Sequence, residues 1–555
     1  MSGNGSTQAR VLKLDPRDNV LVALTNLRKG ESVNFAGTDY LLPSDVPAKH
    51  KFITKELRAS DQIIMYGVLV GTAVQDLPRG ELLSTRNVRH AAAGFHQSDR
   101  AAGWKAPDVS AWKKKTFLGY YRTDGQVGTR NYWIVLPLVF CENRNLGVLK
   151  QAFEEELGFA APQVYRRQVA ELVRLYREGK PEQLRSFSFS ESKAPAGAAK
   201  VFRNIDGIKF LIHEGGCGGT REDSDNLCAL LAGYIHHPNV AGATVLSLGC
   251  QHAQVPILLQ EIERRDPNFS KPLLVFEQQK SASEASMLSA AIRDTFLGLV
   301  EADKAQRRPA PLSRLTVGLK CGGSDGFSGI SANPAIGHVA DLLAGLGGRG
   351  ILSEFPELCG VEQELINRCV NKDVSSRFIQ LMSDYAARAK AVRSGFEMNP
   401  SPGNIRDGLL TDAMKSAGAA KKGGTSPVTA VLDYPEYSAQ AGLNLQCTPG
   451  NDVECVTAQV GAGANVVLFT TGLGTPTGNP IAPVIKLATN SDLARRMPDI
   501  IDIDTGGIIS GESSIEEMGE QILERVIQVA SGEARTKAEL LAQNDFIPWK
   551  RGVSL

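Results

Sequence analysis

Lys209-Phe-Leu-Ile-His-Glu-Gly-Gly-Cys-Gly-Gly219 is a short apolar run that breaks into a glycine-flanked cysteine. The same pattern recurs at Thr244-Val-Leu-Ser-Leu-Gly-Cys250 and at Leu315-Thr-Val-Gly-Leu-Lys-Cys-Gly-Gly-Ser-Asp325, and a helical pattern follows each segment. An apolar run, a glycine loop and a helix are typical of parallel α/β sheets, whose ligand sites lie outside the carboxyl ends of the strands. The sequence therefore predicts an α/β fold in which Cys217, Cys250 and Cys321 meet at one rim.

These three thiols have two interpretations. Free cysteine is among the most buried residue types, so each one alone is best interpreted as a small core residue. Three cysteines in glycine loops at strand ends instead favour a metal site or a nucleophile, and convergent thiolates suit iron. The other cysteines lack this combination and are predicted to be structural: Cys141, Cys228, Cys359, Cys369, Cys447 and Cys455.

Length, charge and cysteine usage exclude several classes of protein. The 555 residues suffice for two or three domains. With 61 basic against 60 acidic residues, nothing calls for nucleic acid or an anionic membrane as a partner. The N-terminus lacks the basic and then apolar run of a signal peptide, and no apolar segment is long enough to span a bilayer, so we expect a cytoplasmic protein. Nine cysteines without a CxxC pair favour reduced thiols.

Four segments are expected along the chain. Residues 1–98 carry short apolar runs between turn residues, such as Gln62-Ile-Ile-Met-Tyr-Gly-Val-Leu-Val70, and predict a small β-rich domain. Residues 99–116 are polar and predict a linker. Alternating apolar runs and helical patterns then predict two α/β lobes, 117–310 and 311–555, with parallel sheets and a cleft between them.

The sequence also predicts several loops and one clear C-terminal helix. Segments rich in Ala, Pro and Lys near residues 188–200, 303–314 and 415–427 are expected to be loops. The C-terminal helix is the clearest single element, because Ser513 and Glu516 have capping-box spacing and an apolar stripe runs from Ile515 until it stops at Gly532. This stripe predicts a helix that packs against the core.

The segment Phe469-Thr-Thr-Gly-Leu-Gly-Thr-Pro-Thr-Gly-Asn-Pro480 offers a candidate substrate loop. Its glycines are spaced GxGxxxG and a proline interrupts them, so it is a weak dinucleotide signature. Its hydroxyl and backbone N–H groups suit a carboxylate and several sugar hydroxyls. Ser324 and Asp325 can equally cap the following helix or bind a substrate or a metal. Arg130 and Lys320 are candidates for holding an anionic substrate.

Several of these motifs resemble those of the altronate and galactarate dehydratase family. They are Gly119-Tyr-Tyr-Arg-Thr-Asp-Gly-Gln-Val-Gly-Thr-Arg-Asn131, Gly249-Cys250, Lys320-Cys-Gly-Gly-Ser-Asp-Gly-Phe-Ser-Gly-Ile-Ser-Ala-Asn-Pro334 and Thr470-Thr-Gly-Leu-Gly-Thr-Pro-Thr-Gly-Asn-Pro480. The N-terminal region is similar to the small β-clip module, the SAF domain, of that family. One departure is Gln251, where the family usually has a glutamate.

The resemblance implies dehydration of a sugar acid, in which altronate loses water to give 2-keto-3-deoxygluconate with the help of iron. Removing the proton next to a carboxylate builds an ene-diolate, so the site needs a cation at the carboxylate, a base at C2 and an acid for the C3 hydroxyl. A ferrous centre could supply the cation and bind the hydroxyl as a Lewis acid. Iron is thus the expected cofactor, although another divalent cation would also serve.

The resulting site hypothesis assigns three roles. Cys217, Cys250 and Cys321 are expected to hold iron, either as a single ion with help from His252 or as a cluster with one iron open to substrate. His50 and His90 of the N-terminal module, with His252, are the catalytic candidates, the module then folding over the cleft. The substrate-binding candidates are Arg130, Asn131, Lys320, Ser324, Asp325, Thr471, Gly472, Thr475 and Asn479.

Other functions stay open on the sequence alone. The nearest rivals are dehydration of galactarate or another aldarate and expulsion of sulfite from a sulfonated hydroxy acid. A non-catalytic sugar-acid sensor would need neither iron nor thiolates, and an NAD-dependent dehydrogenase is disfavoured by the imperfect glycine loop. The expected partner is a small sugar acid, and analogy with enzymes of this size suggests a homo-oligomer.

Overall fold

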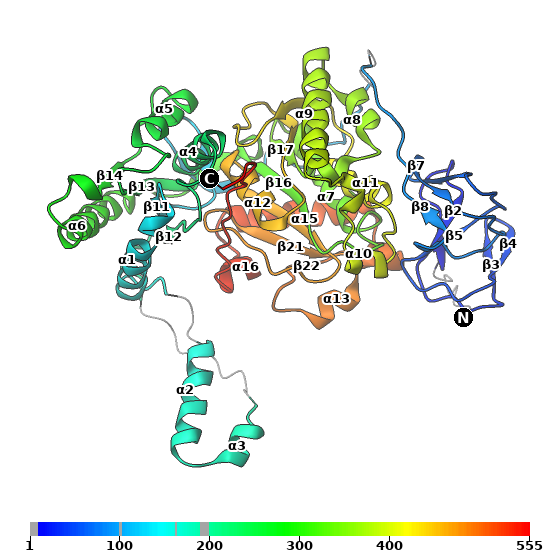
Figure 1. Ribbon diagram of the computed structural model, residues 1–555, viewed down its shortest axis with the longest axis horizontal. Coiled ribbons are helices and arrows are strands. Elements are labelled where there is room, and N and C mark those ends of the chain that lie inside the picture. Colours follow the sequence, from blue (N-terminus) through cyan, green and yellow to red (C-terminus); the bar gives the residue numbers. More distant parts are fainter. Residues whose placement is uncertain (1–8, 99–102, 161–163, 189–198, 555) are drawn as a thin grey trace.

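The computed structural model describes residues 9–98, 103–160, 164–188 and 199–554. Three regions follow one another along the molecule, with the β-rich N-terminal region at one end and a large α/β region in the middle (Figure 1). A second, smaller α/β region forms the other end. The fold class expected from the sequence is confirmed: a small β domain precedes two α/β regions with parallel sheets.

The N-terminal region consists of short antiparallel strands. They form the sheets β1-β2-β5, β3-β4 and β6-β7-β8. Apolar residues alternate with turn residues here, so each strand is short and the strands pack around small cores of Val, Leu and Ile. The strands are β1 (Val11–Leu12), β2 (Val20–Ala23), β3 (Ser32–Phe35), β4 (Thr38–Leu41), β5 (Lys51–Ile53), β6 (Gln62–Met65), β7 (Val68–Ala73) and β8 (Val88–Arg89).

The second region is built on a four-stranded parallel sheet in the order β12-β11-β13-β14. The chain enters and leaves it through a pair of antiparallel strands, β9 and β15. Its elements are β9 (Thr116–Tyr121), β10 (Val127–Gly128), β11 (Tyr132–Pro137), η1 (Phe140–Glu142), α1 (Asn143–Glu156), α2 (Val164–Arg177), α3 (Pro181–Arg185), β12 (Gly207–Phe210), α4 (Arg221–His236), β13 (Val240–Ser247), α5 (Val255–Arg265), β14 (Leu273–Glu277), η2 (Gln278–Lys280), α6 (Glu284–Ala302) and β15 (Arg308–Pro311).

The third region holds a seven-stranded parallel sheet in the order β18-β19-β17-β16-β20-β21-β22. Its elements are η3 (Leu312–Arg314), β16 (Thr316–Cys321), α7 (Ala332–Gly345), β17 (Arg349–Leu352), η4 (Phe355–Leu358), α8 (Glu362–Arg368), α9 (Lys372–Ala391), η5 (Phe396–Met398), α10 (Pro402–Arg406), α11 (Asp412–Ala419), η6 (Ala420–Gly423), β18 (Val428–Leu432), β19 (Gly442–Gln446), α12 (Asp452–Gly461), β20 (Val466–Thr471), β21 (Val484–Ala488), α13 (Ser491–Arg496), β22 (Ile503–Asp504), α14 (Gly507–Ser510), α15 (Ile515–Ala530) and α16 (Lys537–Leu540).

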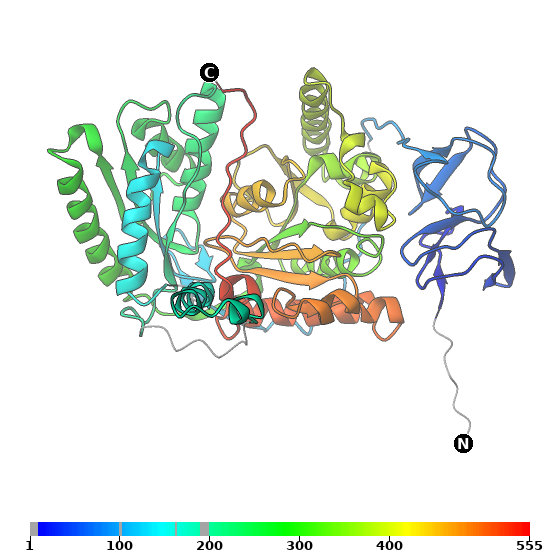
Figure 2. The same ribbon diagram turned by 60° about the horizontal axis from the view of Figure 1, so that its bottom comes forward.

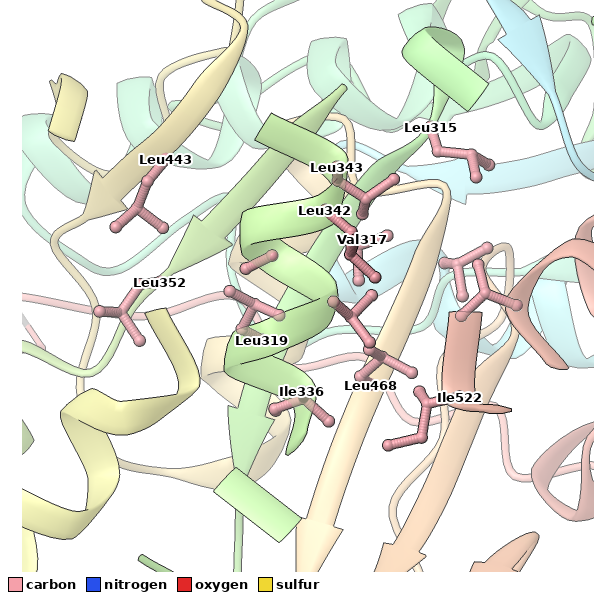
Figure 3. Close-up of a cluster of buried hydrophobic side chains, with 14 of the residues drawn as sticks. Leu315, Val317, Leu319, Ile336, Leu342, Leu343, Leu352, Leu443, Leu468 and Ile522 are labelled. Atoms are coloured by element: carbon pink, nitrogen blue, oxygen red, sulfur yellow. The ribbon is translucent and has the colours of Figure 1, made fainter. Parts of the chain in front are cut away.

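Helices cover both faces of this sheet. On one face Leu319 and Leu468 pack with Ile336 of α7 and Ile522 of α15 (Figure 3). On the other face Phe469, the neighbour of Leu468, belongs to a second core cluster that also contains residues of α4 and α12. A parallel strand that is buried on both faces has a continuous apolar sequence, and the residues of β20 show this pattern. The second cluster also joins the two α/β regions.

Helices α4 and α12 form part of the junction between the two α/β regions. The hydroxyl of Tyr234, near the end of α4, donates to the carbonyl of Thr457 in α12, and Gly233 lies against Gly461 at the end of α12. Helices α4 and α12 therefore pack directly against each other near their C-terminal ends, where the two α/β regions meet. Figure 2 shows the C-terminal tail running along this junction.

Two expectations from the sequence need correction, and a third concerns membrane-spanning helices. The expected linker includes residues 99–102, which lie outside the described residues, but Val109 and Trp112 further along are buried in the main core. The capping box of α15 is formed by Ser514 and Glu517, one residue later than expected, and the helix ends just before Gly532, which has φ +76°. Of the helices in the described ranges, none is both long and apolar enough to cross a membrane.

Candidate active site

A buried cluster of one thiol and two carboxylates lies at the carboxyl ends of two neighbouring strands. Cys321 is the last residue of β16, and Glu354 and Glu357 follow β17. The ligand atoms of these three residues lie within 4.8 Å of one another, and all three side chains are buried. Glu354 has a left-handed backbone with φ +68°, a strained conformation that is commoner at functional sites than elsewhere.

Three buried lysines surround this group. Lys422 of η6 donates to the Sγ atom of Cys321 at 2.8 Å and also to Glu354, which in turn pairs with Lys320. Lys415 of α11 donates to Glu357 at 2.8 Å. Lys320 has a second partner, the carboxylate of Asp452 at the start of α12, at 2.9 Å. Three ammonium groups are thus matched by three carboxylates in one buried network.

The network fixes the protonation states of its members. Burial raises the pKa of the Cys321 thiol to about 11 against the opposing charge of Lys422, so the sulfur keeps its proton at neutral pH. Burial by itself would also raise the pKa of Glu357, but the ammonium groups of Lys415, Lys320 and Lys422 outweigh it and lower that pKa to about 2. A protonated thiol and an ionised carboxylate therefore sit side by side.

Cys321, Glu354 and Glu357 do not fit iron. A thiol and two carboxylates at close range are suitable donors, but each of them already accepts a hydrogen bond from a lysine. The three lysines balance Glu354, Glu357 and Asp452, so a divalent cation would add two charges to a buried network that is already neutral. The cluster and its lysines therefore offer ammonium and carboxylate groups to a substrate, not ligands to a metal.

A polar pocket opens beside the network. Its volume is about 530 Å³, and Glu357 and Lys415 form part of its wall. Asn399, whose side-chain oxygen accepts a hydrogen bond from Lys415 at 2.6 Å, also faces the pocket. The remaining lining residues are Pro356, Tyr385, Ala389, Val392, Ser394, Gly395, Phe396, Met398, Ser401, Asn404, Gly450 and Asn451. Amide and hydroxyl groups around one ammonium suit a small polyhydroxy acid.

The N-terminal module packs against the helix that carries Lys415. The Nδ1 atom of His90 accepts a long hydrogen bond, 3.5 Å, from the backbone N–H of Ala413. Ala413 and Met414 are buried in the core of the N-terminal module. His90 thus lies at the start of α11, where burial lowers its pKa. The module thus packs on α11, but none of its described residues lines the pocket beside Lys415.

A second contact from the module reaches the Asp325 loop. The ammonium of Lys49 lies 2.9 Å from the carboxylate of fully buried Asp325 and 3.1 Å from that of Asp407. Asp325 also accepts hydrogen bonds from the side chains of Thr489 and Asn490. Asp325 therefore anchors the module to the loop after β16. His50, next to Lys49 in sequence, lies at the same contact, where burial lowers its pKa.

The predicted substrate loop after β20 is held by its own contacts. The hydroxyl of Thr471 accepts hydrogen bonds from the backbone N–H groups of Leu473, Gly474 and Thr475. Gly472 lies against the side chain of Asp325, with no room for a Cβ atom. These residues shape the loop, and they are absent from the lining of the pocket beside Lys415.

Other predicted substrate ligands support the fold instead. Arg130 pairs with Glu539 at 2.7 Å, and the side chain of Asn131 donates to the carbonyls of Asn204 and Ala302. Both precede β11, so they lie at the amino edge of the sheet, opposite to the edge that carries ligand sites.

Two more of the predicted ligands also have partners in the fold. The side chain of Asn479 bonds to the hydroxyl of Tyr234 and to the N–H group of Ile481. Ser324 is nearer the pocket, because its carbonyl accepts a hydrogen bond from the lining residue Asn404.

The three predicted metal thiols lie at or after the ends of strands of two different sheets, and their sulfur atoms do not form a group within 4.8 Å of one another. Cys217 and Cys250 follow β12 and β13 of the four-stranded sheet, whereas Cys321 ends β16 of the seven-stranded sheet. The three thiols therefore do not share the rim of a single sheet. The local sequence pattern predicts each strand, but it does not encode which strands pair with one another. His252 lies with the first two, since its backbone N–H donates to the carbonyl of Gly216 at 3.0 Å.

Sequence reasoning singles out Lys320, Glu354 and Glu357 but misses Lys415, Lys422 and Asp452. Glu354 and Glu357 carry the available signal, because both directly follow an apolar strand. Lys415 and Lys422 fall in the segment expected to be a loop, and the structure places them on α11 and η6. A lysine on a short helix carries no pattern that distinguishes it from a surface residue.

Three family models match the chain in succession. The altronate/galactarate dehydratase SAF domain matches residues 9–91, the second domain of D-galactarate dehydratase/altronate hydrolase matches 119–303, and the C-terminal D-galactarate/altronate dehydratase domain matches 312–554. Together with the parallel sheets and the polar pocket, these matches define the class of protein. The chain belongs to the altronate/galactarate dehydratase family.

Relatives of established activity match over nearly the whole chain. Altronate dehydratases of Bacillus subtilis (strain 168) and Escherichia coli (strain K12) are each 31% identical over 547 residues, covering 98% of this chain and 99% of the relative. The galactarate dehydratase (L-threo-forming) of Escherichia coli (strain K12) is 30% identical over 531 residues, 95% of this chain and 93% of the relative. The relatives are therefore sugar-acid dehydratases of two specificities.

Proposed function

We propose that this chain is a hydro-lyase that converts D-altronate to 2-keto-3-deoxy-D-gluconate. The observation that carries the proposal is the wall of the pocket, where the Lys415 ammonium and the Glu357 carboxylate lie 2.8 Å apart. A sugar acid needs a cation for its carboxylate and a base for its C2 proton, and this pair offers both. Similarity to altronate dehydratases over 98% of the chain supports the same reaction class.

The pair suits the first step of the reaction. A substrate carboxylate that enters the pocket competes with Glu357 for the ammonium of Lys415. The pKa of Glu357 is held at about 2 partly by that ammonium, so losing it makes the carboxylate a stronger base. In this proposal Glu357 takes the proton from C2, and Lys415 stabilises the negative charge that develops on the substrate carboxylate.

The second step needs a proton for the departing C3 hydroxyl. We retain His90 as the candidate donor because it lies at the start of α11, the helix that carries Lys415. Its imidazole titrates closer to neutral pH than the carboxylates of the buried network. Iron, which the family resemblance implies, would supply a Lewis acid for the same hydroxyl when bound. His50 lies beside the contact between Lys49 and Asp325, and His252 lies in the loop after β13, where its backbone N–H donates to Gly216.

Turnover of D-altronate under anaerobic conditions tests the proposal, followed as formation of 2-keto acid with and without ferrous iron. Lys415→Met should abolish product formation, whereas Lys421→Met, which removes the same charge outside the pocket, should leave it close to the wild-type rate. If only galactarate gives product, the substrate is galactarate, as the name of the galactarate dehydratase relative indicates for that protein. Binding of sugar acids without turnover in the iron-loaded protein would overturn the proposal in favour of a sensor.

A further inference from the structure

Three loops lie side by side at the carboxyl edge of the four-stranded sheet. The backbone N–H of Phe140, after β11, donates to the carbonyl of Gly215, after β12, at 3.1 Å. The backbone N–H groups of His252 and Ala253, after β13, donate to the carbonyl of Gly216 at 3.0 and 3.1 Å. Backbone contacts therefore connect all three loops directly, and the loop after β12 is the central one.

The central loop is too tightly packed to hold a side chain at one position. Gly216 has φ +98°, and a Cβ atom there would lie 2.0 Å from the carbonyl oxygen of Leu138. Such close approach of one loop to another requires glycine. Each of the three loops carries one cysteine within two residues of these contacts: Cys141, Cys217 and Cys250.

The three thiols differ from the other cysteines in exposure. Cys141 and Cys250 are exposed and Cys217 is half-buried, whereas Cys228, Cys321, Cys369, Cys447 and Cys455 are buried. Within the described part of the chain, no hydrogen bond engages the sulfur of Cys141, Cys217 or Cys250. Unlike Cys321, these sulfurs have no lysine partner to compete with a metal.

We propose that Cys141, Cys217 and Cys250 bind an iron–sulfur cluster. Their sulfur atoms do not form a group within 4.8 Å of one another, which disfavours one ion held by all three. In a four-iron cluster each cysteine ligates a different iron, so the thiolates stand further apart, and three of them leave the fourth iron open. Cys141 replaces Cys321 in the ligand set expected from the sequence.

A buried nitrogen in the same place supports this assignment. The Nδ1 atom of His252 is buried and has no hydrogen-bond partner among the described residues. A buried polar atom without a partner is costly, and a neighbouring cluster or ligating thiolate would supply the acceptor. The proposal deepens the proposed function, on which any catalytic use of the open iron rests, but binding of the cluster is a separate claim.

The test measures iron and sulfide in the full chain after anaerobic reconstitution with ferrous iron and sulfide. We expect roughly four iron and four sulfide per chain with the Mössbauer spectrum of a cluster. Cys141→Ser, Cys217→Ser and Cys250→Ser should each lower the iron content by at least half. Cys321→Ser and the matched half-buried control Cys359→Ser should keep the wild-type content. Circular dichroism of the apo variants shows whether each is folded.

Three results would overturn the cluster. They are full iron content in Cys141→Ser, loss of iron in Cys321→Ser alone, and iron bound without sulfide. The readout is independent of turnover, so the two proposals fail separately. A cluster in a protein that converts no sugar acid rejects the proposed function and keeps this site. Full turnover by a folded Cys141→Ser variant that lacks the cluster rejects catalytic use of the site.

Discussion

Asp412→Asn is expected to stabilise the protein increasingly as the pH rises. Asp412 is fully buried at the start of α11, and both of its carboxylate oxygens lack hydrogen-bond partners among the described residues. Burial, with a further contribution from the charge of Glu357, raises its pKa from 3.8 to about 8. A carboxyl whose folded pKa is raised stabilises the folded state below its unfolded pKa and loses that contribution as the pH rises through the folded value.

The magnitude follows from the size of the shift. Between pH 4 and pH 7 the unfolded carboxyl ionises while the folded one keeps its proton, at about 1.4 kcal/mol per pH unit. Over three units the stability gap between Asp412→Asn and wild type should widen by about 4 kcal/mol in favour of the variant. Near pH 4 the gap should be small, because asparagine then replaces a neutral carboxyl of nearly the same shape.

Urea denaturation followed by tryptophan fluorescence at several pH values between 4.5 and 7.5 measures the gap. Asp499→Asn removes one charge from an exposed position and should follow the wild type at every pH. A gap between Asp412→Asn and wild type that stays constant with pH would refute the reasoning. A gap that reverses sign at pH 7 would mean that Asp412 is ionised in the folded protein and paired with Lys415.

Three other perturbations have defined outcomes. Lys49→Met removes the ammonium between Asp325 and Asp407 and should cost about 3–5 kcal/mol by leaving a buried carboxylate unpaired, measured as a lower urea midpoint that Lys49→Arg largely restores. Leu468→Ala opens a cavity in the core of Figure 3 and should cost about 2–5 kcal/mol by the same measurement, far more than Leu473→Ala at a 38% exposed position. Gly216→Ala should displace the thiol loops and lower the iron content after reconstitution, whereas Gly147→Ala, which has open space around it, should not.

The sequence was sufficient for the local elements of the fold. Each apolar run that ends in a glycine-flanked cysteine is a parallel strand, namely β12, β13 and β16, and each is followed by a helix. Local hydrophobic pattern determines these elements, because a buried parallel strand and its crossover helix each have their own periodicity. The β-rich N-terminal module could be predicted for the same reason.

The composition of the candidate site could not be predicted in this way. Cys321 has the same local pattern as Cys217 and Cys250, yet it joins a different sheet, since strand pairing depends on contacts that are distant in sequence. Cys141 lacks a preceding glycine, so the pattern that selected the other thiols passed over it. It reaches the same edge because β11 lies between β12 and β13.

The C-terminal tail links the two candidate sites physically. The backbone N–H of Arg551 donates to Asp223 at 2.8 Å, at the start of α4 and just after the loop of Cys217. The Arg551 guanidinium also pairs with Asp433, which follows β18 of the other sheet. The tail thus joins the two carboxyl edges, and it crosses the junction seen in Figure 2. One residue of the tail, Arg551, thus contacts the carboxyl end of a strand of each sheet, so in the proposed enzyme the cluster thiols and the ammonium–carboxylate network would lie on separate domains that this tail connects.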